Sequence, residues 1–564
     1  MKAPTLFISI LLFAGVVTQS ADHDIVDTNV GKVRGLKVTA VNGKSLWSFR
    51  GIRYAMPPVG RLRFAKPVPY PRARDTIDAR EQPPYCIRYL SSKYKSSEDC
   101  LYLNIFLKDI NTNLAVKKKV LVYTQSTDAF RYGSLVTDHD IIIVSVQHRD
   151  GPFGYLAIKS AGINGNYGLW DQVLALEWVK NNIGAFGGDA DDVTFGGFDN
   201  EGILALTPTT KGLFTKVFAK DGMKGFSDKE AEQSDEKIIN FAQTLNCWHD
   251  KNTTDLNLGD KLDIIQCLRS LPTLDDSKAD YFNEIDEKMW RGFLPVTDGS
   301  FLPKSISALL KDDNYLEDIG FYEKKYFITI SNNKHDTVAK GFFNAFQSFN
   351  DELFESDEFW EVFFLIHAKS FIADHLNIES VTDDLASEVL NWYETNSHVL
   401  SNLAMQTDLM FTIPTQDILD TIARSRKTSV WFLYFNHYPQ FLKEDFRGMI
   451  FNLDLLYLFD MEIHDLRQNY GPFMTGEFQK EDDELKKLFS SIVASFVQNG
   501  NPENPLLTSI PTGWPIYDLV GRYYLDFNTR PTVKRNWKNQ IRQLWQQDVP
   551  KWAYRQMEDN HIEL

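Results

Sequence analysis

Three consecutive segments between Asp140 and Gly197 decide the fold class: residues 140–146 are DIIIVSV, residues 171–181 are DQVLALEWVKN, and residues 193–197 are VTFGG. The first is apolar without strict alternation, which is typical of a strand covered on both faces. The second has its apolar residues at helical spacing, and the third is a short strand that ends in a glycine turn. Strand, helix, strand and turn in this order predict an α/β fold with a large, mostly parallel central sheet flanked by helices.

Neighbouring segments continue this pattern. Residues 120–123 (VLVY) form another strand-like run, and Asp357–Phe371 and Asp383–Tyr393 predict amphipathic helices, which we expect to cap the sheet. We find no internal repeat, low-complexity tract or linker rich in Gly, Pro or Ser that would divide the chain.

The composition excludes several classes of function. The chain has 564 residues, of which 43% are hydrophobic and 13% aromatic, so it can bury a large core and is unlike a disordered protein. Its formal net charge of -16 disfavours nucleic acid or an anionic membrane surface as the main partner, because both require a basic face. We interpret the negative net charge of the chain as a feature that keeps the protein soluble.

The first residues resemble a secretory signal peptide. Lys2 precedes an apolar stretch from Leu6 to Val17, which is too short to span a bilayer, and cleavage after Ser20 or Ala21 fits the small residues there. A membrane anchor is the alternative, but the chain becomes strongly polar immediately afterwards. We therefore expect residues 1–20 to be removed, no membrane span in the rest of the chain, and passage through the secretory pathway.

The cysteines agree with that compartment. In an oxidising environment, pairing of Cys86 with Cys100 and of Cys247 with Cys267 is the simplest of three possible connectivities, and each bridge would contribute about 2–4 kcal/mol. Metal binding is the alternative, but no Cys-x-x-Cys pair or His cluster lies near them, so we expect no metal and no cofactor. A glycosylation sequon at Asn252 (NTT) falls inside the second loop.

A series of further motifs follows in a fixed order along the chain. They are FRGIRYA (49–55), PPVGRLRF (57–64), SEDCLYLN (97–104), RDGPFGYL (149–156), GNYGLWDQ (165–172), AFGGD (185–189), KGLF (211–214), VTDGSFL (296–302) and WPIY (514–517). In sequence and order they closely resemble the type-B carboxylesterase/cholinesterase family. This resemblance covers nearly the whole mature chain and implies one α/β-hydrolase domain, residues 21–560, with a deep gorge. Both sequential cysteine pairs fall where this family usually has disulfides.

Members of the family hydrolyse esters with a Ser–His–Glu triad and backbone donors for the oxyanion. At the nucleophile turn, where the family has G-x-S-x-G, residues 197–201 are GFDNE, so Asp199 stands at the serine position and Glu201 at the second glycine. An aspartate can act as a nucleophile, but it then needs a histidine to activate water for the second step.

The histidine position lacks that base. The family text G-x-x-H-x-x-D-L-x-Y-x-F appears as GMIFNLDLLYLF (448–459), in which Phe451 replaces the histidine and accepts no proton. At the acid position, residues 330–336 are ISNNKHD, and His335 replaces the glutamate. His335 could act as a relocated base towards Asp199, but the acid position normally reaches the nucleophile only through the residue at 451. A polar remnant or a solvent-facing side chain is the simpler interpretation.

The oxyanion loop has changed as well. Where the family has H-G-G-G, this chain has Gln125, Ser126, Thr127 and Asp128. Side chains there hinder the close backbone approach that glycines permit, and Asp128 brings a negative charge near the site of a developing oxyanion. Each changed position lies between intact framework residues, so a misplaced alignment does not explain all four. The resemblance therefore implies a family scaffold without an esterase mechanism.

The last four residues, His561, Ile562, Glu563 and Leu564, resemble the endings read by the ER retrieval receptor. They predict residence in the ER lumen, with secretion as the alternative. We expect an inactive member that binds a lipophilic or acylated small molecule in the old gorge, or a protein partner. Two alternatives stay open: an enzyme with altered ester or acyl chemistry through Asp199 or His335, and a secreted adhesion or matrix protein.

Overall fold

The protein is described by a computed structural model. It covers residues 24–87, 95–110, 116–124, 132–198, 201–220, 234–250, 255–275, 292–331, 357–376, 378, 380–396, 401–441, 454–459, 478–510 and 512–559.

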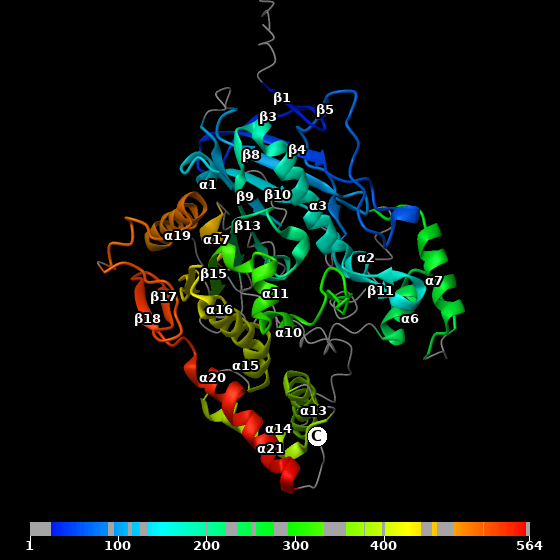
Figure 1. Ribbon diagram of the computed structural model, residues 1–564, viewed down its shortest axis with the longest axis vertical. Helices are drawn as coiled ribbons and strands as arrows, with labels where there is room; N and C mark the ends of the chain where they lie inside the picture. The colour runs from blue at the N-terminus through cyan, green and yellow to red at the C-terminus, as the bar shows by residue number, and fades with distance from the viewer. Residues whose placement is uncertain are drawn as a thin grey trace, which may run out of the picture.

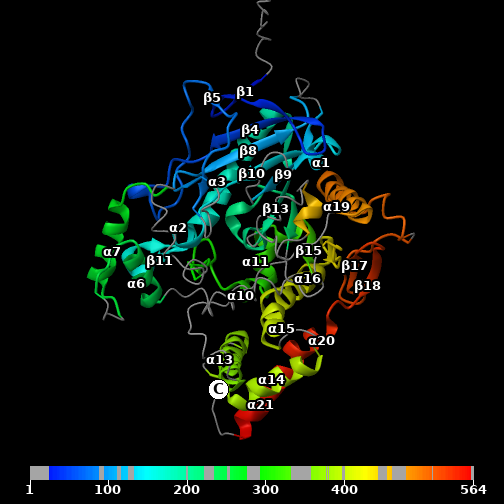
Figure 2. The same ribbon diagram turned by 180° about the vertical axis from the view of Figure 1, so that it is seen from behind.

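An eleven-stranded sheet organises the described part of the chain, with strand order β18-β17-β16-β15-β14-β13-β9-β10-β8-β4-β3 (Figures 1 and 2). The strands from β17 to β10 are parallel, whereas β18 at one end and β8, β4 and β3 at the other are antiparallel to their neighbours. The bounds are β3 Leu36–Thr39, β4 Ser45–Arg53, β8 Tyr102–Leu107, β9 Lys118–Tyr123, β10 Ile142–Val146, β13 Gly188–Phe198, β14 Lys216–Lys220, β15 Lys325–Ser331, β16 Val430–Phe435, β17 Tyr523–Phe527 and β18 Thr532–Arg535.

Smaller strands lie beside this sheet. A three-stranded sheet has the order β1-β2-β5, and two strand pairs, β6 with β7 and β11 with β12, are separate from it. Their bounds are β1 Ile25–Thr28, β2 Gly31–Arg34, β5 Ile77–Asp78, β6 Tyr85–Cys86, β7 Ser96–Ser97, β11 Ala157–Ile158 and β12 Ile163–Asn164.

Helices cover both faces of the large sheet. Their bounds are α1 Gly133–Thr137, α2 Gly151–Tyr155, α3 Tyr167–Asn182, α4 Glu201–Ala205, α6 Asp235–Thr244, α7 Leu258–Ser270, α10 Ile306–Leu310, α11 Asp313–Asp318, α13 Asp357–Leu376, α14 Asp383–Asn396, α15 Ser401–Thr407, α16 Ile413–Ser425, α17 Leu455–Leu458, α19 Lys480–Asn499, α20 Asn539–Gln543 and α21 Val549–Asp559.

The central strands are largely apolar because alternate side chains enter two different cores. Val122 packs in one core with residues of α3, whereas its neighbour Leu121 packs in the other with residues of α17 and α19. Side chains of successive strand residues point to opposite faces, so a strand covered on both faces needs apolar residues at most positions. This arrangement confirms the predicted α/β fold and places the three deciding segments in β10, α3 and β13.

The two amphipathic helices predicted after residue 350 exist, but their role differs from the prediction. α13 and α14 share a third core with α15 and the C-terminal helix α21, and apart from Val381, which lies just before α14, the buried residues of that core come from helical segments. Figure 1 places these helices together at the end of the molecule opposite β1 and β5. The expectation that they cap the sheet was wrong, because their apolar faces are covered by one another.

Candidate functional site

The strand ends that border the expected site lie at one edge of the sheet. Thr124 follows β9, Phe198 ends β13 and Ser331 ends β15, and each stands immediately before a segment that the sequence assigned to the site. β9 pairs directly with β13, and β14 lies between β13 and β15. Parallel strands place their carboxyl ends together, which is where ligands bind in open α/β sheets. The framework residues around the expected site are therefore brought together.

The residues expected to make up the site lie outside the described part of the chain. The same is true of the sequon, the signal peptide and the tail. These positions are Gln125, Ser126, Thr127, Asp128, Asp199, His335, Phe451, Asn252, residues 1–20, and His561, Ile562, Glu563 and Leu564. Their roles remain predictions from the sequence.

A buried ion pair joins two of the bordering segments. Lys220 is the last residue of β14, directly opposite Phe198 of β13, and its ammonium lies 3.3 Å from a carboxylate oxygen of Asp454. Both side chains are only 1% exposed. Asp454 follows position 451 by three residues and precedes α17. The pair therefore joins the start of α17 to the end of β14.

Sequence reasoning missed this pair. Lys220 ends an apolar strand (KVFAK), and Asp454 lies in the matched family motif, but nothing local connects residues so far apart in the chain. A charged residue at the end of a buried strand is the one available signal, since such a charge requires a partner.

A second polar cluster surrounds Tyr457 of α17. Asp482, in the first turn of α19, accepts a hydrogen bond from the Tyr457 hydroxyl (2.6 Å) and lies 2.8 Å from Nε2 of His437. Its other oxygen accepts the backbone N–H of Gln479, which completes a capping box. The rings of Tyr457 and Phe435 pack against His437, so this His–Asp pair lies within the core beneath α17. Its arrangement is that of a structural tie between three segments.

The environment of Asp482 favours its ionised form. Burial opposes ionisation, but the contacts with His437, Tyr457 and the Gln479 amide outweigh it and hold the pKa of Asp482 below its usual value. A carboxyl group whose pKa is lowered in the folded state contributes stability above its unfolded pKa of about 3.9, and this contribution is lost as pH falls through the folded value.

We therefore expect Asp482→Asn to reduce the free energy of unfolding near neutral pH by about 1–3 kcal/mol, and to flatten the loss of stability below pH 4. The matched control is Asp260→Asn, which breaks the exposed capping box that Asp260 forms with Asn257 in α7. Urea unfolding at several pH values between about 3 and 7 measures the free energy of unfolding of both variants. Equal pH profiles for Asp482→Asn and the parent protein would contradict the assignment.

Both expected disulfides are present. Cys86 is bonded to Cys100 with Cα atoms 4.8 Å apart, and Cys247 to Cys267 with Cα atoms 5.5 Å apart. Disulfides persist in oxidising compartments, so they are consistent with the secretory pathway.

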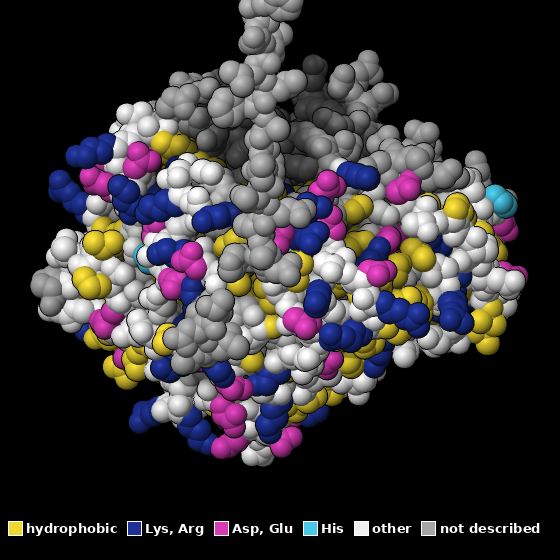
Figure 3. Space-filling view, turned by 90° about the horizontal axis from the view of Figure 1, so that it is seen from above, with side chains coloured by type: hydrophobic (Ala, Val, Ile, Leu, Met, Phe, Trp, Pro, Cys, Tyr) yellow, Lys and Arg dark blue, Asp and Glu magenta, His cyan; other side chains and the backbone are white. Residues whose placement is uncertain are grey.

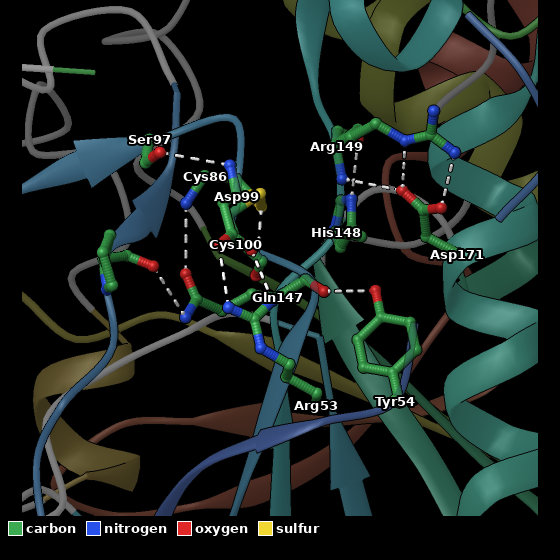
Figure 4. Close-up of a disulfide and its surroundings, with 11 residues drawn as sticks. Arg53, Tyr54, Cys86, Ser97, Asp99, Cys100, Gln147, His148, Arg149 and Asp171 are labelled. Carbon is green, nitrogen blue, oxygen red and sulfur yellow. Dashed lines mark hydrogen bonds and ion pairs between the residues drawn. A yellow bond between two sulfur atoms is a disulfide. The ribbon is translucent and has the colours of Figure 1, made fainter. Parts of the chain in front are cut away.

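Figure 4 shows how the first disulfide connects to the sheet. The side-chain oxygen of Gln147 accepts the Cys86 amide (3.1 Å), and its backbone oxygen accepts the Tyr54 hydroxyl (2.7 Å). Arg149, two residues further along, forms a buried bidentate pair with Asp171 of α3. Tyr54, Arg149 and Asp171 belong to three of the motifs that carried the family resemblance, and their buried hydrogen bonds lie just beyond the end of β10.

The described residues contain neither a membrane-spanning helix nor a cluster of metal ligands. None of the helices there is both long enough and apolar enough to cross a membrane. No group of three or more His, Cys, Asp or Glu side chains within those ranges is arranged to hold a metal ion.

A mostly parallel sheet with antiparallel strands at both ends and helices on both faces is the architecture that α/β-hydrolases share with other α/β proteins. The model of the Carboxylesterase family matches residues 22–545, and this chain belongs to that family. It is 27% identical to a medium-chain fatty acyl-CoA hydrolase precursor of Anas platyrhynchos, over 96% of each chain. It is 24% identical to an acetylcholinesterase of Electrophorus electricus, over 97% of this chain and 92% of the relative.

Proposed function

We propose that this chain is a non-hydrolytic member of the Carboxylesterase family that binds an apolar or acylated ligand in the former gorge. One observation carries the proposal: the nucleophile, base, acid and oxyanion-loop positions are all replaced, within framework motifs that are retained. The arrangement of the described framework supports it, because β9, β13, β14 and β15 still bring their carboxyl ends together. Fold alone does not determine function, so the proposal depends on those replaced residues.

In this proposal residues 21–560 form one domain that retains the gorge but no longer catalyses ester hydrolysis. A protein partner at the mouth of the gorge is the second candidate. An enzyme that works through Asp199 or His335, and an adhesion or matrix role outside the cell, are the alternatives that the experiments below would reveal.

Ligand capture tests the proposed binding. A relative acts on fatty acyl-CoA according to its name, so octanoyl-CoA and p-nitrophenyl octanoate are suitable probes. A ligand present at about 100 times its dissociation constant stabilises the folded state by about 2.7 kcal/mol. We expect one of these probes to raise the thermal midpoint, and free CoA, which has no acyl chain, to leave it unchanged. If no acyl compound raises the midpoint, the gorge-binding proposal fails and the protein-partner candidate remains.

We also propose that the protein is retrieved to the ER lumen through His561 to Leu564. The two disulfides support entry into the secretory pathway, and the terminal tetrapeptide supports retrieval. Deletion of these four residues is expected to move most of the protein into the culture medium of expressing cells. Addition of two alanines after Leu564 is the control, because the receptor reads a free terminus and should release that variant equally. Secretion of the unmodified chain would support the extracellular alternative.

A further inference from the structure

β18 is the last strand at one end of the large sheet. Among the described residues β17 is the strand that pairs with β18, and Thr532, Lys534 and Arg535 of β18 are exposed. Figures 1 and 2 both place β17 and β18 at the side of the molecule. An edge strand presents N–H and C=O groups that can pair with another extended segment.

A rigid turn projects apolar side chains at one end of this edge. Asp518 accepts the amides of Val520 (2.7 Å) and Gly521 (2.6 Å) with one carboxylate oxygen, and its backbone oxygen accepts the amide of Arg522 (2.9 Å). Val520 is 92% exposed and Leu519 is 39% exposed. The turn leads directly into Tyr523 of β17, which faces Arg535 of β18. The exposed pair Leu519–Val520 is therefore held beside the end of the edge strand.

A pocket lies at the other end of the same edge. The Ser509 hydroxyl donates to the backbone oxygen of Pro531, the residue before β18, and so fixes the loop of residues 503–510 against the start of the strand. This loop and Trp514 line an open pocket of about 350 Å³, to which Leu507, Ile510 and Trp514 contribute apolar atoms and Glu503 contributes a carboxylate. Apolar features thus lie at both ends of β18.

The edge is basic in an acidic protein. Residues 522–542 contain six Lys or Arg and one Asp, whereas the whole chain has a net charge of -16. Several of these cations are paired: Arg522 and Arg542 with Asp420, Lys538 with Asp408, and Lys534 with Asp526. Arg530 and Arg535 have no carboxylate partner within the described ranges, although Arg535 also stacks on Tyr523. Two exposed cations therefore remain, Arg530 shortly before β18 and Arg535 at its end.

We propose that the outer edge of β18 is a docking site for an extended, acidic segment of a partner protein, which adds to the sheet as a further strand. Backbone pairing would supply affinity, Arg530 and Arg535 would attract carboxylates, and Leu519–Val520 and the pocket would contact apolar side chains at the two ends. The docking site does not include the gorge. The docking proposal can therefore fail while the ligand proposal holds, and the reverse.

Charged residues on an edge strand also serve to prevent aggregation, and this is the competing explanation. It accounts for Lys534 and Arg535 but not for a braced turn that exposes two apolar side chains beside them. The opposite edge of the sheet allows a direct comparison, since β3 carries the exposed Lys37, and Val41 follows it with 45% exposure. Figure 3 shows the face that includes the first strands, where acidic and basic side chains are interspersed.

The test uses the full mature chain and a fluorescein-labelled peptide of about ten residues that alternates valine and glutamate. We expect binding in fluorescence anisotropy that weakens about tenfold between roughly 50 and 500 mM salt. Val520→Asp with Arg535→Glu should weaken it at least about tenfold, whereas Lys37→Glu with Val41→Asp on the opposite edge should not. A peptide with lysine in place of glutamate, and one with two central prolines, should not bind to the unmodified protein.

Three results would overturn the proposal. They are no binding of the valine–glutamate peptide, equal binding of the proline peptide, and equal weakening by the two pairs of substitutions. Sedimentation velocity identifies a different occupant: a dimer that is lost in the Val520→Asp, Arg535→Glu protein would mean that the edge binds a second copy of this chain. The proline peptide is tested on unmodified protein, so the outcome does not depend on whether a variant folds.

Discussion

Purified protein is expected to hydrolyse short carboxylic esters no faster than buffer does. Loss of the nucleophile or the base of a serine hydrolase lowers kcat by about a million-fold, and loss of one oxyanion donor by about 100-fold to 1,000-fold. The family resemblance predicts that Asp199, Phe451 and His335 occupy the nucleophile, base and acid positions, and that residues 125–128 occupy the positions of the oxyanion-loop glycines. Hydrolysis of p-nitrophenyl butyrate by the pure protein measures the effect, with an intact family esterase as the positive control.

Serine-directed labelling gives an independent measurement. A fluorophosphonate should leave the protein unlabelled, because the family resemblance places Asp199 rather than a serine at the nucleophile position. The restored variant Asp199→Ser, His335→Glu, Phe451→His should remain a weak esterase. Further replacement of Gln125 to Asp128 by His-Gly-Gly-Gly should increase its rate by about 100-fold to 1,000-fold. Substantial turnover by the unmodified chain that disappears in Asp199→Ala would establish the alternative, an enzyme with aspartate chemistry.

Breaking the Lys220–Asp454 pair is expected to give the largest loss of stability among single substitutions at the sheet edge. Removal of one partner from a buried ion pair typically costs about 3–5 kcal/mol, because the other charge stays buried without its counter-charge. Lys220→Met should therefore lower the free energy of unfolding by about that amount. The double variant Lys220→Met, Asp454→Leu should recover much of the loss, since replacing both charges by apolar groups is often neutral. Urea unfolding of the single and double variants measures the coupling.

The control is an exposed pair of the same residue types. Lys44 lies 2.7 Å from Asp138, and the two side chains are 58% and 37% exposed. Lys44→Met is expected to change stability by less than about 1 kcal/mol, because exposed pairs contribute little. If Lys220→Met costs no more than Lys44→Met, or if the double variant is as unstable as the sum of the single ones, the pair does not stabilise the junction of α17 and β14.

Much of the fold was predictable because its strands satisfy a strong physical condition. A strand buried on both faces is apolar at most consecutive positions, and Ile142–Val146 fits this condition with Ser145 as its one polar residue. The disulfide pairing was one of three possibilities until the family resemblance selected it. The grouping of α13, α14 and α21 was not predictable in this way, because an amphipathic helix shows which side is apolar but not which surface covers it.

The site is a prediction of a different kind, since its residues lie outside the described part of the chain. Its positions followed from motifs on both sides of them, so the sequence could indicate which groups are replaced. The Lys220–Asp454 pair and the His437–Asp482–Tyr457 cluster could not be found that way. Each joins segments that are distant in the chain, and such contacts depend on how the strands and helices pack in three dimensions.

The strand order also limits how much of the sheet can form while the chain is being synthesised. β16 is covered on its outer side by β17, which lies near the end of the chain, after the long helix α19. A polypeptide that ends before Tyr523 would present Val430–Phe435 as a terminal strand, and five of its six side chains are buried in the full protein. Contacts between distant parts of a chain form late, and an apolar strand without its neighbour is prone to aggregate. Nascent chains would thus depend on chaperone protection until translation is almost complete, and late nonsense mutations should yield insoluble products.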